Sequence, residues 1–278
     1  MITLDGKHGW VVSYLNKHNL TNNAVSEIHN NSRTMCTTIK PNWKFDELPK
    51  NIAGKGYQGA AMALSGKHSG IFSLIWPAQH EGREVLHYMI KGELWYTNRE
   101  TGKEEIIQVD FVMHDENMGK SQHRFLEEWL DICLSYDNDN ETLTMSVRAE
   151  SQDEWNTKEE KLGCKIIDYS GGHVWIGCAN AFDTQSNEQF WKGYCKSAGL
   201  FAKKLDDSER DRFFKEYPKF KGIAKYFRGY AHRRQVYNFE QMKPIVFTNF
   251  LTTTHYKAYD FSGNGNHPMI YKEEWGLY

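Results

Sequence analysis

Residues 191–217 read WKGYCKSAGLFAKKLDDSERDRFFKEY and predict one strand followed at once by one short helix. The part up to Ala202 is rich in aromatic and apolar residues, which favour strands. Asp206 stands where a helix N-cap is expected, and Glu209 follows at the spacing of a capping box. Pro218 ends the helix, because proline cannot continue its hydrogen-bonding pattern. We therefore predict a strand that is followed directly by a capped helix, and we interpret the other segments in relation to these two elements.

The clearest periodicity lies in residues 130–147. Apolar side chains occupy every second position in 130–136 and again in 143–147. The sequence DNDN at 137–140 lies between the two runs and has the chemistry of a turn. This pattern predicts an antiparallel hairpin with one face buried and the other face in water.

Further apolar runs lie on both sides of that hairpin. Residues 65–69, SGKHS, separate two of these runs as a hairpin loop does, and Gly92 and residues 101–102 are expected to break the others. The runs are residues 60–64, 70–76, 85–90, 93–97 and 106–112. Together the strands predict an all-β chain folded as a two-sheet antiparallel jelly-roll sandwich.

Composition sets the class of protein. The chain has 278 residues, is 40% hydrophobic and 14% aromatic, and carries a net charge of -2. These values are typical of a globular protein that can bury a full core. A near-zero charge argues against a dedicated nucleic-acid binder, which would usually be strongly basic. No run is long enough to span a membrane as a helix.

The cysteines and the first residues of the chain indicate the cellular compartment in which the protein folds. The five cysteines, an odd number without a C-x-x-C motif, predict buried free thiols and folding in a reducing compartment. A bridge from Cys164 or Cys178 to Cys195 is the alternative, and no spacing supports it. The opening MITLDGKHGWVVSYL has neither a basic nor an apolar signal-peptide region, so we expect no secretory signal.

Several of these segments resemble the laminin-G-like domain of the concanavalin A-like lectin and glucanase superfamily. The resemblance implies a concanavalin A-like jelly roll with a short helix and a C-terminal extension. It is carried by residues 190–209, by WLDICLSYD at 129–137, by VWIG at 174–177 and by AYDFSGNGNH at 258–267. The last motif normally opens such a domain, and here Pro268 replaces the usual glycine that follows it.

This displaced motif decides the predicted domain organisation. Residues 1–217 are expected to form the sandwich, and residues 218–255 a basic, aromatic extension or arm. Residues 256–278 would return to the sandwich as a terminal strand beside residues 2–4, which makes the domain circularly permuted. Chain ends of compact domains commonly lie close together, so such a permutation is structurally easy.

The resemblance also implies a calcium site, because laminin-G-like domains often hold this ion at the rim through oxygen ligands. The matching positions are Asp260, Asn264 and Asn266, with Asp5 nearby if the chain ends pair. For Asp260 the alternative is a side chain that caps its own glycine-rich turn. Asp137 and Asp139 of the 137–140 turn could hold calcium in the same way, but ordinary turn chemistry is the favoured interpretation for them.

The carboxylates do not show a glycosidase pattern. Such an enzyme needs two carboxylates projecting from one strand face, and the E-x-D-x-x-E spacing that supplies them in part of the superfamily is absent. We expect Glu93, Asp110 and similar residues at a solvated rim and at strand edges.

A polysaccharide lyase is the enzymatic alternative, since it needs a Tyr or His base and a cation that neutralises a uronate. Residues 87–98, HYMIKGELWYTN, superficially resemble a strand of one alginate lyase family, although the spacing differs and its companion motifs are missing. A lyase would use Tyr96, Lys91 and His87. A non-enzymatic glycan-binding protein would contact its ligand with Trp95, Tyr96 and His87.

The extension offers a second surface. One interpretation is a docking site for an anionic glycan, nucleic acid or an acidic protein, and the other is an amphipathic segment with its cations in water. The candidate partner-binding residues are Lys219, Lys221, Lys225, Tyr226, Arg228, Tyr230, Arg233 and Arg234.

The functional hypothesis joins these observations. Laminin-G-like domains are mostly extracellular, and phage proteins frequently carry them. We therefore expect a non-enzymatic virion surface protein, a decoration or fibre-associated module made in the cytoplasm and released by lysis. It would contact glycan or virion proteins and assemble as a homo-oligomer or with other components, without specific nucleic-acid binding or membrane insertion.

Overall fold

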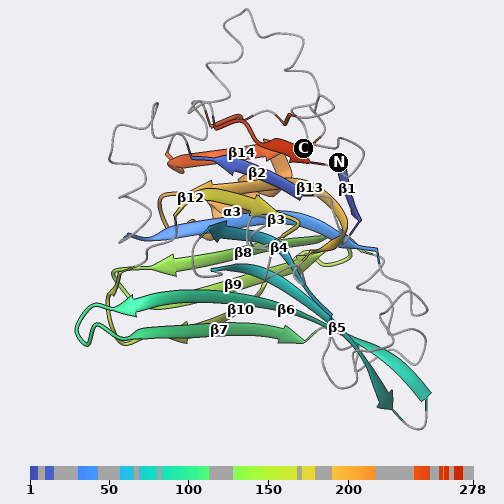
Figure 1. Cartoon of the computed structure of the whole chain (residues 1–278), viewed down its shortest axis with the longest axis horizontal. Coiled ribbons are helices and arrows are strands. Elements are labelled where there is room, and N and C mark those ends of the chain that lie inside the picture. Colours follow the sequence, from blue (N-terminus) through green and yellow to red (C-terminus); the bar gives the residue numbers. More distant parts are fainter. Residues whose placement is uncertain are drawn as a thin grey trace, which may run out of the picture.

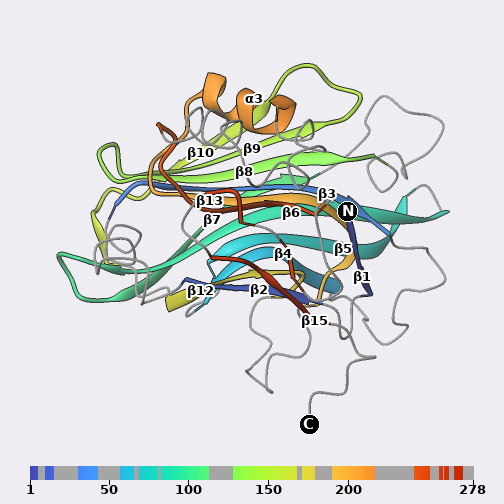
Figure 2. The same ribbon diagram turned by 90° about the horizontal axis from the view of Figure 1, so that it is seen from above.

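The computed structural model confirms an all-β sandwich of two antiparallel sheets with one short helix among the described residues. The two sheets face each other across the core, and α3 (Asp207–Glu216) lies on the outer side of one of them (Figures 1 and 2). The structure describes residues 1–5, 10–15, 31–42, 57–65, 69–80, 83–112, 128–167, 171–178, 190–216, 241–250, 257–258, 260–262 and 266–271.

The first sheet, which we call the helix-side sheet, has the order β1-β13-β3-β8-β9-β10, and β14 also pairs with β13. β1 and β14 lie end to end along the same edge of β13, because they pair with its first and second halves. Its strands are β1 (Ile2–Asp5), β3 (Arg33–Pro41), β8 (Leu130–Asp137), β9 (Thr142–Ala149), β10 (Asn156–Lys161), β13 (Lys192–Phe201) and β14 (Pro244–Asn249).

The second sheet, which we call the open-side sheet, has the order β11-β6-β5-β4-β12-β2-β15, and β7 pairs with the other edge of β6. Its strands are β2 (Trp10–Tyr14), β4 (Tyr57–Ser65), β5 (Gly70–His80), β6 (Arg83–Asn98), β7 (Glu104–Val112), β11 (Ile166–Ile167), β12 (Gly171–Ile176) and β15 (Met269–Tyr271).

The opening stretch of the sequence folds as predicted, with β13 followed by α3. The Asp206 carboxylate accepts a hydrogen bond from the Glu209 backbone N–H at 2.8 Å, and the Glu209 carboxylate accepts one from the Asp206 N–H at 3.1 Å. This reciprocal pair is a capping box, which satisfies backbone donors that a helix end leaves unpaired. α3 therefore begins where local chemistry sets its start.

The hairpin of β8 and β9 is confirmed, but its predicted wet face is wrong. Every residue of β9 is buried, including Ser146 at 1% exposure and Arg148 at 8%. The reason is α3, whose Arg210 donates a hydrogen bond to the Ser146 hydroxyl and whose Asp211 pairs with Arg148 at 2.8 Å. The helix covers the polar face of the hairpin at this point, so β9 is buried on both sides.

The predicted break at Gly92 is also wrong, because β6 runs unbroken through it. Gly92 faces the opposite sheet, where a Cβ atom would collide with Leu134 and lie 3.2 Å from the Met145 sulfur. Glycine here permits close approach of the two sheets rather than a turn. The main core lies between the sheets at this level, with Ile90, Leu134 and Met145 among its members.

The C-terminal segments belong to the sandwich in two places. β14 is a partner of β13, so the part of the predicted arm from Pro244 to Asn249 is a strand of the helix-side sheet. β15 pairs with β2 of the open-side sheet and not with the strand of Ile2. The Met1 amino group instead donates to the Phe250 carbonyl oxygen at the end of β14. Among the described helices, none has the length and apolar character needed to cross a membrane.

Candidate glycan-binding face

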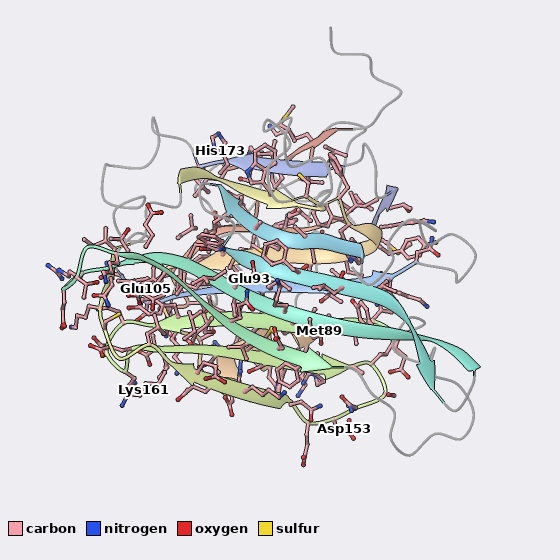
Figure 3. All side chains as sticks on the ribbon, turned by 60° about the horizontal axis from the view of Figure 1, so that its bottom comes forward. Met89, Glu93, Glu105, Asp153, Lys161 and His173 are labelled. Carbon is pink, nitrogen blue, oxygen red and sulfur yellow. The ribbon has the colours of Figure 1, made fainter. Side chains whose placement is uncertain are left out.

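The alternation of β6 divides the predicted site between two sides of a sheet. Ile90, Leu94 and Tyr96 belong to the core, so Lys91, Glu93 and Trp95 point to the outer face of the open-side sheet. Met89 and Glu93 mark this outer face in Figure 3. A strand with period two cannot bring Trp95 and Tyr96 to the same ligand.

A polar network lies on this outer face. Lys91 and Glu93 form an ion pair, although their side chains are only 12% and 7% exposed. Gln108 of β7 donates to Glu93 Oε1 at 2.9 Å, and the Lys91 ammonium lies 5.8 Å from the ring centroid of Phe72 on β5. Three adjacent strands thus fix these donors and acceptors in place.

Glu93 is therefore not the solvated rim carboxylate that we expected. It is one of the most buried charged residues of the described chain, and its pairing with Lys91 offsets the cost of that burial. Asp110 lies directly opposite Lys91 in the β6–β7 register. Its Oδ1 atom is buried and has no hydrogen-bond partner among the described residues.

An apolar strip borders the network. Trp95 is partly exposed and lies opposite Ile106, which is 40% exposed. The Trp95 backbone is fixed by Ser69, whose hydroxyl accepts a hydrogen bond from the Trp95 N–H at 3.1 Å. An aromatic surface beside fixed polar groups is the combination that recognises sugars, because a pyranose has apolar faces and a polar rim. We call Lys91, Glu93, Trp95, Gln108 and Asp110 the β6–β7 face.

Tyr96 has a structural role. It is 7% exposed, and its hydroxyl donates to Glu105 Oε2 at 2.8 Å. Burial, and then the hydrogen bond to Glu105, raise the pKa of Tyr96. A buried phenol with a raised pKa, on the face opposite Lys91, cannot act as a base on a substrate held by that lysine. Only the backbone of His87 is described, opposite Trp76 in β5.

Asp260 anchors the C-terminal turn. Its two carboxylate oxygens accept four hydrogen bonds, from the N–H groups of Phe247, Ser262 and Asn266 and from the Ser262 hydroxyl, at 2.7 to 3.2 Å. Asn266 donates to the Ile245 carbonyl at 2.8 Å. These contacts match the alternative in which Asp260 caps its own turn, and they tie the turn to β14.

The side chains at two other positions of the predicted calcium site are not described by the structure. Asn264 lies outside the described residues, and so does the side chain of Asp5. Within the described ranges, no group of three His, Cys, Asp or Glu side chains could hold a metal ion. Calcium binding at this turn stays a prediction.

Asp137 shows the turn chemistry that we expected. Its carboxylate accepts from the N–H groups of Asp139 and Asn140 and from the Asn140 side chain, and Lys204 lies 3.3 Å away. Burial opposes ionisation, but the hydrogen bonds from Asn140 and Asp139 hold the pKa of Asp137 below its usual value.

The predicted partner-binding residues of the arm all lie outside the described residues. They are Lys219, Lys221, Lys225, Tyr226, Arg228, Tyr230, Arg233 and Arg234. Sequence reasoning missed Gln108 and the grouping of Glu93 with Asp110. Strand alternation could have placed each on a face, but only the register of β6 with β7 shows that they meet.

Comparisons with known proteins leave the family open. No protein-family model matches the chain, and no curated protein matches it. Among solved structures, it is similar to full-length tailspike protein 2 from Escherichia coli O157:H7 bacteriophage CAB120, with a TM-score of 0.38 and 11% identity over 69% of this chain and 22% of that one.

Two further structures are similar to a comparable degree. The binding domain of botulinum neurotoxin serotype G has a TM-score of 0.40 and 13% identity, over 68% of this chain and 37% of that one. The NanB sialidase from Streptococcus pneumoniae has a TM-score of 0.36 and 16% identity, over 74% of this chain and 26% of that one. The chain thus spans 22% to 37% of the lengths of these three structures. The TM-scores are low, so the fold of this chain rests on its own strand pairings.

Proposed function

We propose that this protein is a non-enzymatic binding module that recognises saccharide on the β6–β7 face. The observation that carries the proposal is the nearly buried Lys91–Glu93 ion pair, which accepts a hydrogen bond from the exposed Gln108 and lies on a sheet face beside the partly exposed Trp95. Charged groups are costly to bury, and here they are held in fixed positions beside an aromatic ring. That arrangement suits the hydroxyl groups and apolar face of a sugar ring.

The proposal also covers the biological role of the module. The resemblance of the sequence to laminin-G-like domains supports a module of that type, and such modules are common in phage structural proteins. We therefore propose a decoration or fibre-associated role on a virion surface, outside the cell after lysis. Glycan or virion proteins are the proposed partners, and a homo-oligomer or a larger assembly is the proposed state.

The test is a glycan array probed with the purified chain, with neutral, sialylated and uronic-acid oligosaccharides. Trp95→Ala should weaken binding to the responding sugar at least about tenfold, since buried aromatic anchors dominate such contacts. Glu93→Gln should also weaken binding, because it removes the charge that positions Lys91. The matched control is Trp129→Ala, directly before β8 of the helix-side sheet, where Lys196 lies over the ring at 3.8 Å.

Further outcomes of the array and of an activity assay test the position of the site, the role of calcium and the lyase hypothesis. Binding that Trp95→Ala and Trp129→Ala reduce equally would refute the β6–β7 face as the site. Binding lost with a chelator would support calcium at the Asp260 turn. Unsaturated, ultraviolet-absorbing products from a uronic-acid polymer would revive the lyase hypothesis. If those products disappear in Lys91→Ala but persist in Tyr96→Phe, the base is a group other than Tyr96.

The assembly role of the arm needs a narrower deletion than the predicted range. Because β14 completes an edge of the helix-side sheet, the deletion must stop before it. Phe213 of α3 and Met242 share one hydrophobic cluster, so a short linker can join residues 216 and 241. Replacing residues 217–240 with a Gly-Ser linker should leave a folded protein with fewer subunits per particle, obtained as the light-scattering mass divided by the mass of the shortened chain. An unchanged number of subunits would show that the arm does not assemble the protein.

A further inference from the structure

Two cysteines that lie far apart in sequence meet in the helix-side sheet. Cys36 of β3 and Cys133 of β8 are direct partners in the antiparallel register. Their sulfur atoms lie 2.8 Å apart, and the residues are 0% and 1% exposed. Carbon atoms in contact prefer roughly 3.5–4.0 Å, and sulfur is larger than carbon. The two thiols are therefore closer than separate groups would lie.

The backbone geometry suits a covalent bond between them. Directly opposed residues of antiparallel strands have Cα atoms roughly 4.5 or 5.5 Å apart, and both distances fall within the range that disulfides span. The side chains already point toward each other. We propose that Cys36 and Cys133 form a cross-strand disulfide when the protein folds or is held in oxidising surroundings.

The other cysteines have different environments. Cys195 lies 3.6 Å from the Thr37 hydroxyl and 3.4 Å from the Ser197 carbonyl oxygen, which leaves its sulfur engaged with oxygen atoms. Cys164 belongs to the inter-sheet core and Cys178 to an apolar cluster with Trp175. In the part of the chain that the structure describes, only Cys36 and Cys133 face each other across neighbouring strands. The bond is therefore specific to this pair.

The chemistry requires an oxidant and an opening of the fold. Each thiol loses its proton, and the pair gives two electrons to a disulfide oxidant such as oxidised glutathione, which is released as two thiols. Burial raises the pKa of the Cys36 thiol, and its neighbour Cys133 raises it further. Exchange proceeds through the thiolate, so the closed protein reacts slowly. The bond therefore forms before Phe213 of α3 seals the pair, or during a local opening.

The bond should stabilise the folded protein because of the two strands that it joins. It would link residues 97 positions apart in the sequence, and long loops lose the most unfolded-state entropy when they are closed. It would also join β3 to β8 at the centre of the sheet, beneath the cluster of Phe201 and Phe213. A protein made with reduced thiols would thus become more resistant to unfolding after oxidation.

The experiment is refolding of the full chain from reduced denaturant in a glutathione redox buffer, followed by alkylation and mass spectrometry. We expect a species lighter by two hydrogen atoms with three alkylated cysteines, and a linked peptide pair containing residues 36 and 133. Its thermal midpoint should exceed that of the same protein refolded with reductant by several degrees.

Matched variants make the result decisive. Cys36→Ala and Cys133→Ala should each abolish the linked species, whereas Cys195→Ala, at an equally buried position, should retain it. Five alkylated cysteines after oxidative refolding would overturn the proposal. So would a linked peptide joining other cysteines, or a bridge that Cys36→Ala leaves intact. If both cysteine variants fail to fold, the peptide map of the wild-type protein still decides.

Discussion

The guanidinium group of Arg148 contacts the carboxylate of Asp211, with Nη1 2.8 Å from Oδ1, and this ion pair joins β9 to α3. Arg148 also lies over the ring of Trp155 at 4.3 Å and pairs with Asp131 of β8 at 3.2 Å. Trp155 donates to the same Asp211 oxygen at 3.0 Å. The buried Arg148 on the polar face of the hairpin is thus paired in part by the helix that covers it.

Arg148→Ala should destabilise the protein. It leaves the Asp131 carboxylate without its cation under the helix, and breaking a buried pair in this way costs about 3 kcal/mol. Urea unfolding followed by tryptophan fluorescence measures the change. Arg148→Lys should recover only part of the loss, because an ammonium cannot reach both carboxylates and stack on Trp155. Lys161→Ala, on exposed β10, is the control and should change stability little.

Gly92→Ala should also lower the free energy of unfolding, because it overpacks the core. The added methyl group would meet Leu134 and Met145 of the facing sheet, and overpacking of this kind costs about 1–3 kcal/mol. The matched control is Gly102→Ala. Gly102 has a φ of +67° with no atom near its missing Cβ, so it tests backbone strain without collision. A Gly92→Ala protein as stable as wild type in thermal unfolding would contradict the close approach of the sheets.

Tyr96→Phe should lower the stability of the protein without changing glycan binding. The change removes the hydrogen bond to Glu105 and should cost about 1 kcal/mol of unfolding free energy. Glycan binding should be unchanged, because Tyr96 lies on the face opposite Trp95. Calorimetry and the glycan array check the two expectations on one sample. Loss of binding with full stability would place Tyr96 in the site and refute the division of β6 into two faces.

The pH dependence of stability should change in Asp211→Asn. Burial opposes ionisation of Asp211, but hydrogen bonds from Lys215, Trp155 and Arg148 lower its pKa from 3.8 to about 2. A carboxylate with a lowered folded-state pKa stabilises the protein above its unfolded-state pKa, and the effect is lost as pH falls through the folded value. The gap between wild type and Asp211→Asn should therefore be full above pH 3.8 and close toward pH 2.

Urea midpoints at a series of pH values measure this gap. Burial raises the pKa of Asp260, which gives a pH dependence of opposite sign. That effect is present in both proteins and cancels in the difference between them. A gap that stays constant down to pH 2 would show that Asp211 does not titrate in this way.

The sequence by itself determined the strands β4, β5, β7, β8, β9 and β13, the β8–β9 hairpin and the start of α3. These features depend on neighbours a few residues apart, as in the contact between Asp206 and Glu209, so local chemistry decides them. It also predicted correctly that the chain is a two-sheet antiparallel sandwich, because alternating apolar patterns need a second sheet to cover them.

Only the tertiary structure decided which face of each strand is covered and which distant residues meet. Alternation places Trp95 and Tyr96 on opposite sides of β6, but it does not say which side faces the core. The covering of β9 by α3, the place of β14 beside β13 and the meeting of Cys36 with Cys133 all depend on strand order and register. Those are properties of contacts between segments far apart in the chain, and no short stretch of sequence encodes them.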